Sequence, residues 1–244
     1  MQFLQVGGLV MLLACFKALR LENMKVSPYA LREGVLHDLL GRLEQRDPRD
    51  KTVTAFMARY SVDQEQVNRV RRVALKACDK IADGMFLRPI HRELLAWAAD
   101  LHETGLSVSH SQYQAHSGYL VENSDMAGFS RQEQQFLAAL VRQHRRGVPR
   151  DFANQLPARM HEPLRMTLFC LRFACILCRT RDDSSIPSFK LSGTNNMLTV
   201  NFADDWKVNH PLTMTDLEQE SKDLRAIKLQ FRVIRPEPED HHET

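Results

Sequence analysis

Three amphipathic segments follow one another between Leu94 and Arg150, and they constrain the fold more than any other feature of the chain. Apolar residues recur at helical spacing in each segment. His102 ends the first segment, His116 lies in the second and His144 follows the third. The pattern predicts three helices whose ends carry these histidines and a run of arginines. We therefore expect any binding or chemistry to centre on this stretch.

Positive charge is concentrated just after the third segment. The 244 residues carry 33 Lys and Arg against 30 Asp and Glu, so the net charge of +3 says little about partners. Four arginines, however, fall within nine residues: Arg142, Arg145, Arg146 and Arg150. A local basic patch attracts a polyanion even when the whole chain is near neutral, and guanidinium groups grip phosphate oxygens bidentately. The alternative is a merely solvated face.

The histidine at the end of the first segment also has two interpretations. His102 is followed directly by Glu103. One interpretation is a binding-site residue. The other is a helix-end histidine that hydrogen-bonds a neighbouring carbonyl, with Glu103 paired to a nearby arginine or histidine. Both alternatives stay open from the sequence.

The cysteines and the apolar N-terminal run bear on the compartment. An odd count of five cysteines argues against a disulfide framework. Cys170, Cys175 and Cys178 lie in an apolar segment that predicts a buried helix, although three thiols could also bind a metal. The apolar run at 3–16 is short, interrupted and preceded by no Lys or Arg. We expect a cytoplasmic protein with no integral membrane segment.

The order of the patterns predicts a mainly α chain with a small α+β part at its end. Ser27 and Pro28 predict a helix that runs through Leu40. A polar linker at 179–188 precedes a predicted hairpin around Gly193. A helix at 216–228 and a strand at 229–234 then complete this part. The expected domains are 1–45, a helical domain at 46–182, an α+β domain at 183–236 and a disordered tail at 237–244.

Five motifs carry a resemblance to a known family. They are ALREG at 30–34, LHETG at 101–105, HSGYL at 116–120, NSDMAGF at 123–129 and QHRR at 143–146. In this order they resemble the C-terminal half of bacterial exopolyphosphatases, which share a family with guanosine pentaphosphate phosphatases. The resemblance covers nearly the whole chain. It implies an HD-like helical domain, a small α+β domain, and a remnant helix of an actin-like (ASKHA) domain at 1–45.

The resemblance also implies a function. Family members release orthophosphate processively from inorganic polyphosphate, with Mg²⁺ assistance, in two actin-like domains that would precede this chain. We therefore expect a truncated or split form, with its status as an enzyme open and no catalytic residue assigned. Expected partners are inorganic polyphosphate, a second copy and a separate N-terminal catalytic chain, but no nucleic acid. The expected polyphosphate-binding residues are Arg142, His144, Arg145, Arg146, Arg150, His102 and His116.

A metal site of the HD type is the weaker expectation. Such phosphohydrolases use an upstream His, a His-Asp doublet, later histidines and a late Asp, which converge on a divalent metal. Here the weak candidates are His102, Glu103, His116 and His144. The upstream His is missing near 49–51 and the late Asp near 174–175. Three alternatives to polyphosphate binding stay open: a guanosine pentaphosphate phosphatase fragment, an HD-type metallophosphohydrolase, and a dimerisation module.

Overall fold

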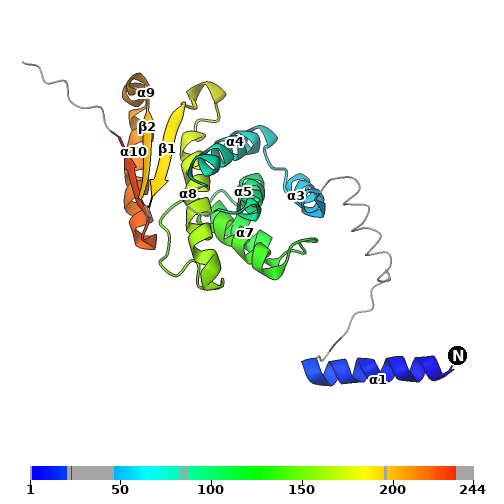
Figure 1. The fold of residues 1–244 in the computed structure, drawn as a ribbon. Helices are drawn as coiled ribbons and strands as arrows, with labels where there is room; N and C mark the ends of the chain where they lie inside the picture. Colours follow the sequence, from blue (N-terminus) through cyan, green and yellow to red (C-terminus); the bar gives the residue numbers. More distant parts are fainter. Residues whose placement is uncertain are drawn as a thin grey trace, which may run out of the picture. The chain divides into compact units, whose positions relative to one another are not determined.

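A computed structural model describes residues 2–20, 23, 47–82, 84, 87–194 and 197–234 (Figure 1). The chain divides into two compact units, Met1–Arg46 and Asp47–Thr244. The described part of the first unit is helix α1, Gln2–Leu19, on which Leu9, Val10 and Met11 are exposed. None of the described helices combines the length and apolar character that a bilayer crossing requires. The helix predicted to run through Leu40 lies outside the described residues, as does the predicted tail.

The second unit contains the three predicted helices together with others. Its α-helices before the sheet are α3 (Pro48–Arg59), α4 (Gln64–Ile81), α5 (Pro89–Leu101), α6 (Tyr113–Asn123), α7 (Arg131–Gln143) and α8 (His161–Leu177). Short 3₁₀ turns are η2 (Thr104–Ser107), η3 (Ala158–Met160) and η4 (Asp183–Ser185). The mainly helical fold class is therefore confirmed.

Local sequence signals explain where these helices begin. Asp63 accepts hydrogen bonds from the backbone N–H groups of Glu65 and Gln66 and so caps α4. Ser130 and Glu133 form a reciprocal capping box at the start of α7. Because both caps satisfy backbone donors that a helix leaves open, they fix the first turns of α4 and α7.

Helix α8 lies at the centre of the second unit. The sheet and α10 lie on one side of it, and α4, α5 and α7 on the other (Figure 1). It is buried on most of its surface, including Cys170, and the three cysteines are free thiols in the predicted buried segment. A helix that is apolar nearly all round is stable only when it is surrounded in this way.

The sheet has three strands in the order β1-β2-β3. Strands β1 (Phe189–Thr194) and β2 (Met197–Phe202) form the predicted hairpin, with Phe189 opposite Phe202. Strand β3 (Gln230–Val233) pairs with β2 in parallel. Between them run α9 (Asp204–Asn209), α10 (Pro211–Leu224) and η5 (Arg225–Ile227). The connection from β2 to β3 is thus helical, as parallel pairing requires.

Aromatic side chains join the sheet to α8. The ring of Phe173 lies 5.1 Å from that of Phe189 and 6.2 Å from that of Phe231, measured between centroids. The helical and α+β segments therefore share one core. The boundary predicted between 182 and 183 stays a prediction about independent folding.

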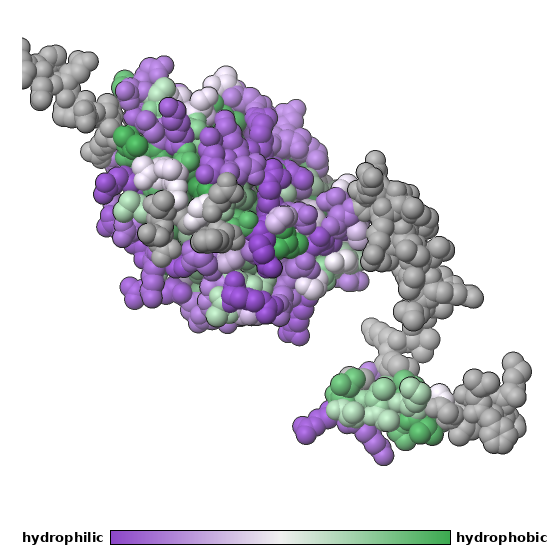
Figure 2. Space-filling model, in the orientation of Figure 1, coloured by the Kyte–Doolittle hydropathy of each residue, from purple (hydrophilic) through white to green (hydrophobic). Residues whose placement is uncertain are grey.

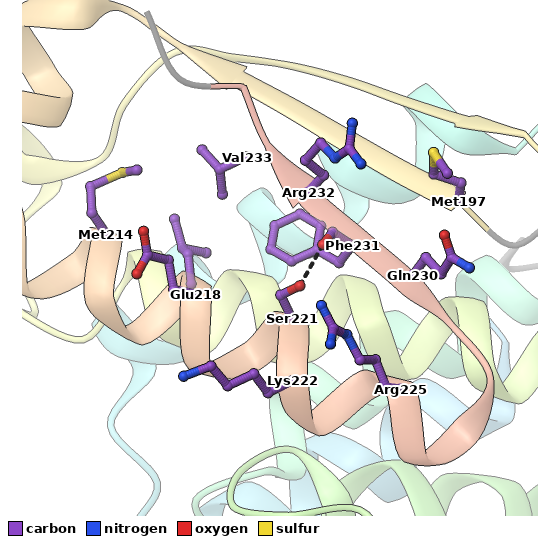
Figure 3. Close-up of a pocket in the computed structure, with 11 residues that line it drawn as sticks. Met197, Met214, Glu218, Ser221, Lys222, Arg225, Gln230, Phe231, Arg232 and Val233 are labelled. Atoms are coloured by element: carbon purple, nitrogen blue, oxygen red, sulfur yellow. Dashed lines mark hydrogen bonds between the residues drawn. The ribbon is translucent and has the colours of Figure 1, made fainter.

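A groove runs between α10 and β3, with a volume of about 560 Å³ (Figure 3). The Ser221 hydroxyl donates a hydrogen bond of 2.6 Å to the carbonyl oxygen of Phe231, which ties the helix to the outer strand of the sheet. The visible face of the second unit is mainly hydrophilic (Figure 2).

Candidate functional site

The ends of α5 and α7 bring two of the three predicted histidines together. His102 follows the last residue of α5 and His144 follows the last residue of α7. Their imidazole rings meet edge to face, with centroids 5.2 Å apart. Both side chains are almost fully buried, with 1% and 2% of each residue exposed.

Each of these histidines uses one ring nitrogen on the backbone. The Nδ1 atom of His102 lies 2.7 Å from the carbonyl oxygen of Ala99, and that of His144 lies 2.7 Å from the carbonyl of Val141. A carbonyl oxygen only accepts, so Nδ1 carries the proton and Nε2 of the neutral ring is an acceptor. Burial lowers the pKa of both imidazoles, and the neighbouring His102 lowers that of His144 further. Both rings are therefore neutral at pH 7.

Tyr113, the first residue of α6, completes this buried group. Its hydroxyl oxygen lies 3.4 Å from Nε2 of His144, which makes it the donor to that acceptor. The guanidinium of Arg145 lies over its ring, 4.8 Å from the centroid. Burial raises the pKa of the Tyr113 phenol, so the hydroxyl keeps its proton.

These side chains form the floor of a cavity of about 380 Å³. Residues from several elements line it: Gln66, His102, Glu103, Tyr113, His144, Arg145, Arg146, Arg172, Cys175, Ile176, Arg179, Arg181, Asp216, Gln219, Glu220 and Asp223. Five of them are arginines and four are carboxylates. The cavity is therefore highly charged around a neutral floor.

Two of the arginines are neutralised by buried carboxylates. Arg172 is only 2% exposed, and both its Nε and Nη2 atoms donate to Glu220 at 2.6 Å. Its Nη1 atom donates to the carbonyl of Gln143. Arg181 donates to Glu103 at 2.6 Å and to Asp63 at 2.8 Å. These ion pairs hold the walls of the cavity in place. They also balance most of the positive charge that Arg172 and Arg181 would otherwise offer to an anionic ligand.

The arginines that follow α7 differ in this respect. Arg145 and Arg146 are exposed, and within the described ranges neither forms an ion pair with a carboxylate. Arg179 is also exposed but pairs with Asp216. Arg145 and Arg146 are therefore the cations at this cavity that an anion would meet unpaired.

Comparison with known proteins places this arrangement in a family. The protein-family model described as "Ppx/GppA phosphatase, domain III" matches residues 49–221 of the chain. The chain belongs to the Ppx/GppA phosphatase family. It is 36% identical over 231 residues to the guanosine-5'-triphosphate,3'-diphosphate pyrophosphatase of Pseudoalteromonas translucida (strain TAC 125). That match covers 94% of this chain and 46% of the relative, so the chain spans less than half of the relative's length.

In the structure, the predicted phosphate-binding residues lie at several separate places. Arg142 forms an ion pair of 2.6 Å with Glu122 and lines a different cavity. Arg150 lines a third cavity. His116 lies half-buried on α6 and does not line the cavity of His102 and His144.

A backbone turn explains the division of the arginines. Arg146 adopts a left-handed conformation with φ of 66°, and the chain changes direction there. Arg145 and Arg146 therefore line the first cavity, whereas Arg150 lies beyond the turn and lines another cavity. A single row of these arginines along one polyphosphate chain stays a prediction.

The weak metal candidates are not gathered into one metal-binding group among the described residues. Mg²⁺ prefers oxygen ligands in octahedral geometry, but His102 and His144 offer ring nitrogens, and Glu103 already accepts from Arg181. The described residues contain no group of three His, Cys, Asp or Glu side chains placed to hold a metal. The hydrogen bond of His102 to a carbonyl and the ion pair of Glu103 match the structural alternatives that the sequence left open.

Sequence reasoning missed several residues of the cavity. Arg179 and Arg181 lie in the segment interpreted as a polar linker, and Tyr113 precedes the apolar face of its helix. A signal for Arg172 was present, because a single charged residue inside the apolar run FCLRFACILC must find a buried partner.

Proposed function

We propose that this chain is the domain III region of a guanosine pentaphosphate phosphatase, and that its arginine-rimmed cavity binds phosphate groups of that nucleotide. The observation that carries the proposal is the 36% identity, over 94% of the chain, to a relative named for this nucleotide. The comparison favours this substrate over polyphosphate, which was the first expectation from the sequence.

The chemistry of the cavity supports phosphate binding at its rim. Arg145 and Arg146 stay charged at all physiological pH values and present planar donor groups that fit phosphate oxygens. The floor offers two neutral hydrogen-bonding groups: the Nε2 atom of His102, which accepts, and the Tyr113 hydroxyl oxygen, which still accepts while it donates to His144. Such groups suit the hydroxyl and amino groups of a nucleoside. The arrangement therefore fits a ligand with an anionic end and a polar, neutral end.

The proposal assigns binding, and no hydrolytic step, to these residues. Hydrolysis of the terminal phosphoanhydride is proposed for the whole protein of this type, of which the chain spans less than half. Binding by this region would then contribute affinity for the nucleotide.

Calorimetric titration of the chain with guanosine pentaphosphate tests the proposal. We expect binding that weakens steeply with added salt in the wild type, because charge–charge contacts with phosphates are screened. The variant Arg145→Glu/Arg146→Glu should bind at least about tenfold more weakly, since each charge-assisted hydrogen bond contributes roughly 1.5–3 kcal/mol. The control Arg59→Glu/Arg131→Glu makes the same charge change at exposed positions that do not line the cavity.

Competition with long-chain polyphosphate separates the two substrates. Polyphosphate that binds more tightly and cannot be displaced by guanosine pentaphosphate would restore the polyphosphate hypothesis. A folded wild-type chain that binds neither ligand would refute phosphate binding at this cavity.

A further inference from the structure

A second cavity, in the unit Asp47–Thr244, concentrates positive charge and has no carboxylate among the described residues that line it. It has a volume of about 490 Å³ and is lined by Arg150, Phe152, Ala153, Asn154, His161, Arg165, Arg225, Ala226, Ile227 and Lys228. It shares no lining residue with the cavity of His102 and His144. It lies where the segment after α7, the first turns of α8 and the turn that follows α10 meet.

Most of its cations lack a partner. Arg150, Arg225 and Lys228 are exposed, and their side chains form no ion pair or hydrogen bond within the described part of the chain. Arg225, which directly follows α10, also lines the groove between α10 and β3, and Figure 3 shows it from that side. Like charges gathered on one concave surface repel one another, and a bound anion relieves that repulsion.

Arg165 forms the inner wall and is more constrained. Its Nη1 atom donates 3.1 Å to the carbonyl of Ile227, and its Nη2 atom pairs with Glu162. Its Nε atom is buried and has no partner in the described residues. Burial lowers the pKa of this guanidinium, yet an arginine stays protonated in proteins. The inner wall thus carries a guanidinium whose charge Glu162 partly balances and whose Nε–H has no partner among the described residues.

The backbone around the cavity is fixed before any ligand binds. The contact between Arg165 and Ile227 holds α8 against η5. Lys228 lies in a left-handed conformation with φ of 60°, and its N–H donates to the carbonyl of Arg225. His161 is hydrogen-bonded to the carbonyl of Leu156 at 2.8 Å. A site of this kind binds with little cost in ordering its own groups.

We propose that this cavity is a second anion site, which binds a diphosphate group carried by a nucleotide or present as inorganic pyrophosphate. Three unpaired cations and Arg165 match a compact group with several negative charges better than a monovalent anion. The half-buried ring of Phe152 offers a surface on which a base could stack. The site also gives a role to Arg150, which the first cavity leaves unused.

Titration of the whole chain with inorganic pyrophosphate at about 0.15 M salt tests this site. The variant Arg150→Gln/Lys228→Gln should weaken binding at least about tenfold, as expected when charge-assisted hydrogen bonds are lost. The matched control Arg59→Gln/Arg131→Gln removes the same charge at exposed positions that line neither cavity and should change the affinity less than about twofold, because exposed charges away from the site are screened at this ionic strength. Arg225→Gln, a single change at an exposed side chain, replaces the double variant if that variant does not fold.

A parallel titration with guanosine diphosphate distinguishes the source of the diphosphate. Tighter binding of the nucleotide, lost in Phe152→Ala, assigns the site to a nucleotide, whereas equal affinities assign it to inorganic pyrophosphate. The absence of pyrophosphate binding, an equal loss in both double variants, or a loss in the control alone would overturn the second site. Since Arg145→Glu/Arg146→Glu changes the first cavity and Arg150→Gln/Lys228→Gln changes the second, the guanosine pentaphosphate site and this site can fail independently.

Discussion

At the residue scale, the buried pair Arg172–Glu220 makes the sharpest stability prediction. Both residues are at least 96% buried and are joined by two hydrogen bonds of 2.6 Å. Glu220→Ala leaves the buried Arg172 with only one ion pair among the described residues, the longer contact of 3.7 Å to Asp223, so we expect a loss of about 3–5 kcal/mol in the free energy of unfolding by urea. The double variant Arg172→Met/Glu220→Leu should recover most of this loss, because replacing both charges removes the desolvation penalty. A loss below about 1 kcal/mol in the single variant would contradict the buried pair.

The buried histidines predict a pH dependence of stability. The pKa of His144 in the folded chain lies well below its ordinary value. The unfolded chain therefore binds more protons as the pH falls through about 6.5, and stability is lost. Between pH 7 and pH 5 this loss should reach up to about 2 kcal/mol for one histidine, by the same linkage.

Other buried groups also change the stability over this pH range, so the contribution of His144 has to be separated from theirs with the variant His144→Gln. Asp100 acts in the opposite direction, because burial raises its pKa to about 6 and the folded chain takes up its proton first. His91, whose pKa is lowered to about 4 by burial, adds to the loss. The test is therefore the difference in slope between the wild type and His144→Gln. Equal slopes would show that His144 is not held neutral by the fold.

At the element scale, a glycine of the HSGYL motif has a packing role between α6 and α7. Gly118 lies where α6 crosses α7, and a Cβ atom there would come within 2.6 Å of the Cβ atom of Arg142. We expect Gly118→Ala to separate the two helices and to cost about 1–3 kcal/mol of unfolding free energy. Gly147→Ala is the matched control, because a Cβ atom at Gly147 meets nothing within 4 Å. A control as destabilising as Gly118→Ala would exclude the close helix crossing as the cause.

The elements that the sequence predicted are those with local signals. The hairpin followed from alternation around Gly193, and the three central helices followed from their periodicity. Helix α10, expected from 216, begins at Pro211, which fits the first position of a helix. The parallel pairing of β3 with β2 was not predicted, because no local pattern specifies a partner across a helical crossover.

The candidate site was predicted only in part for the same reason. His102 and His144 directly follow regular helices, whose ends the apolar periodicity indicated. The structure places their two rings in contact. Arg142, Arg145, Arg146 and Arg150 were grouped by their closeness in sequence, but they line three cavities. Arg142 lies on α7 and pairs with Glu122, whereas the left-handed turn at Arg146 separates Arg150 from Arg145 and Arg146. Arg181 reaches the site from a distant segment, through a contact with Glu103 that no local pattern indicates.

At the scale of the whole second unit, the aromatic contacts of Phe173 argue for one cooperative fold. The chain has two tryptophans, and they report on different segments. Trp97 in α5 donates to Asp50, whereas Trp206 in α9 lies 4.7 Å from the ring of Phe202. Urea unfolding of Trp97→Phe and of Trp206→Phe, each followed by its remaining tryptophan, should therefore give coincident midpoints once corrected for the stability of each variant. Phe173→Ala, added to both, should lower both transitions by about 3–5 kcal/mol, since it removes the ring that joins the segments. Two separate transitions, with only that of Trp206 sensitive to Phe173→Ala, would instead make the predicted boundary at 182 a true division between independently folding domains.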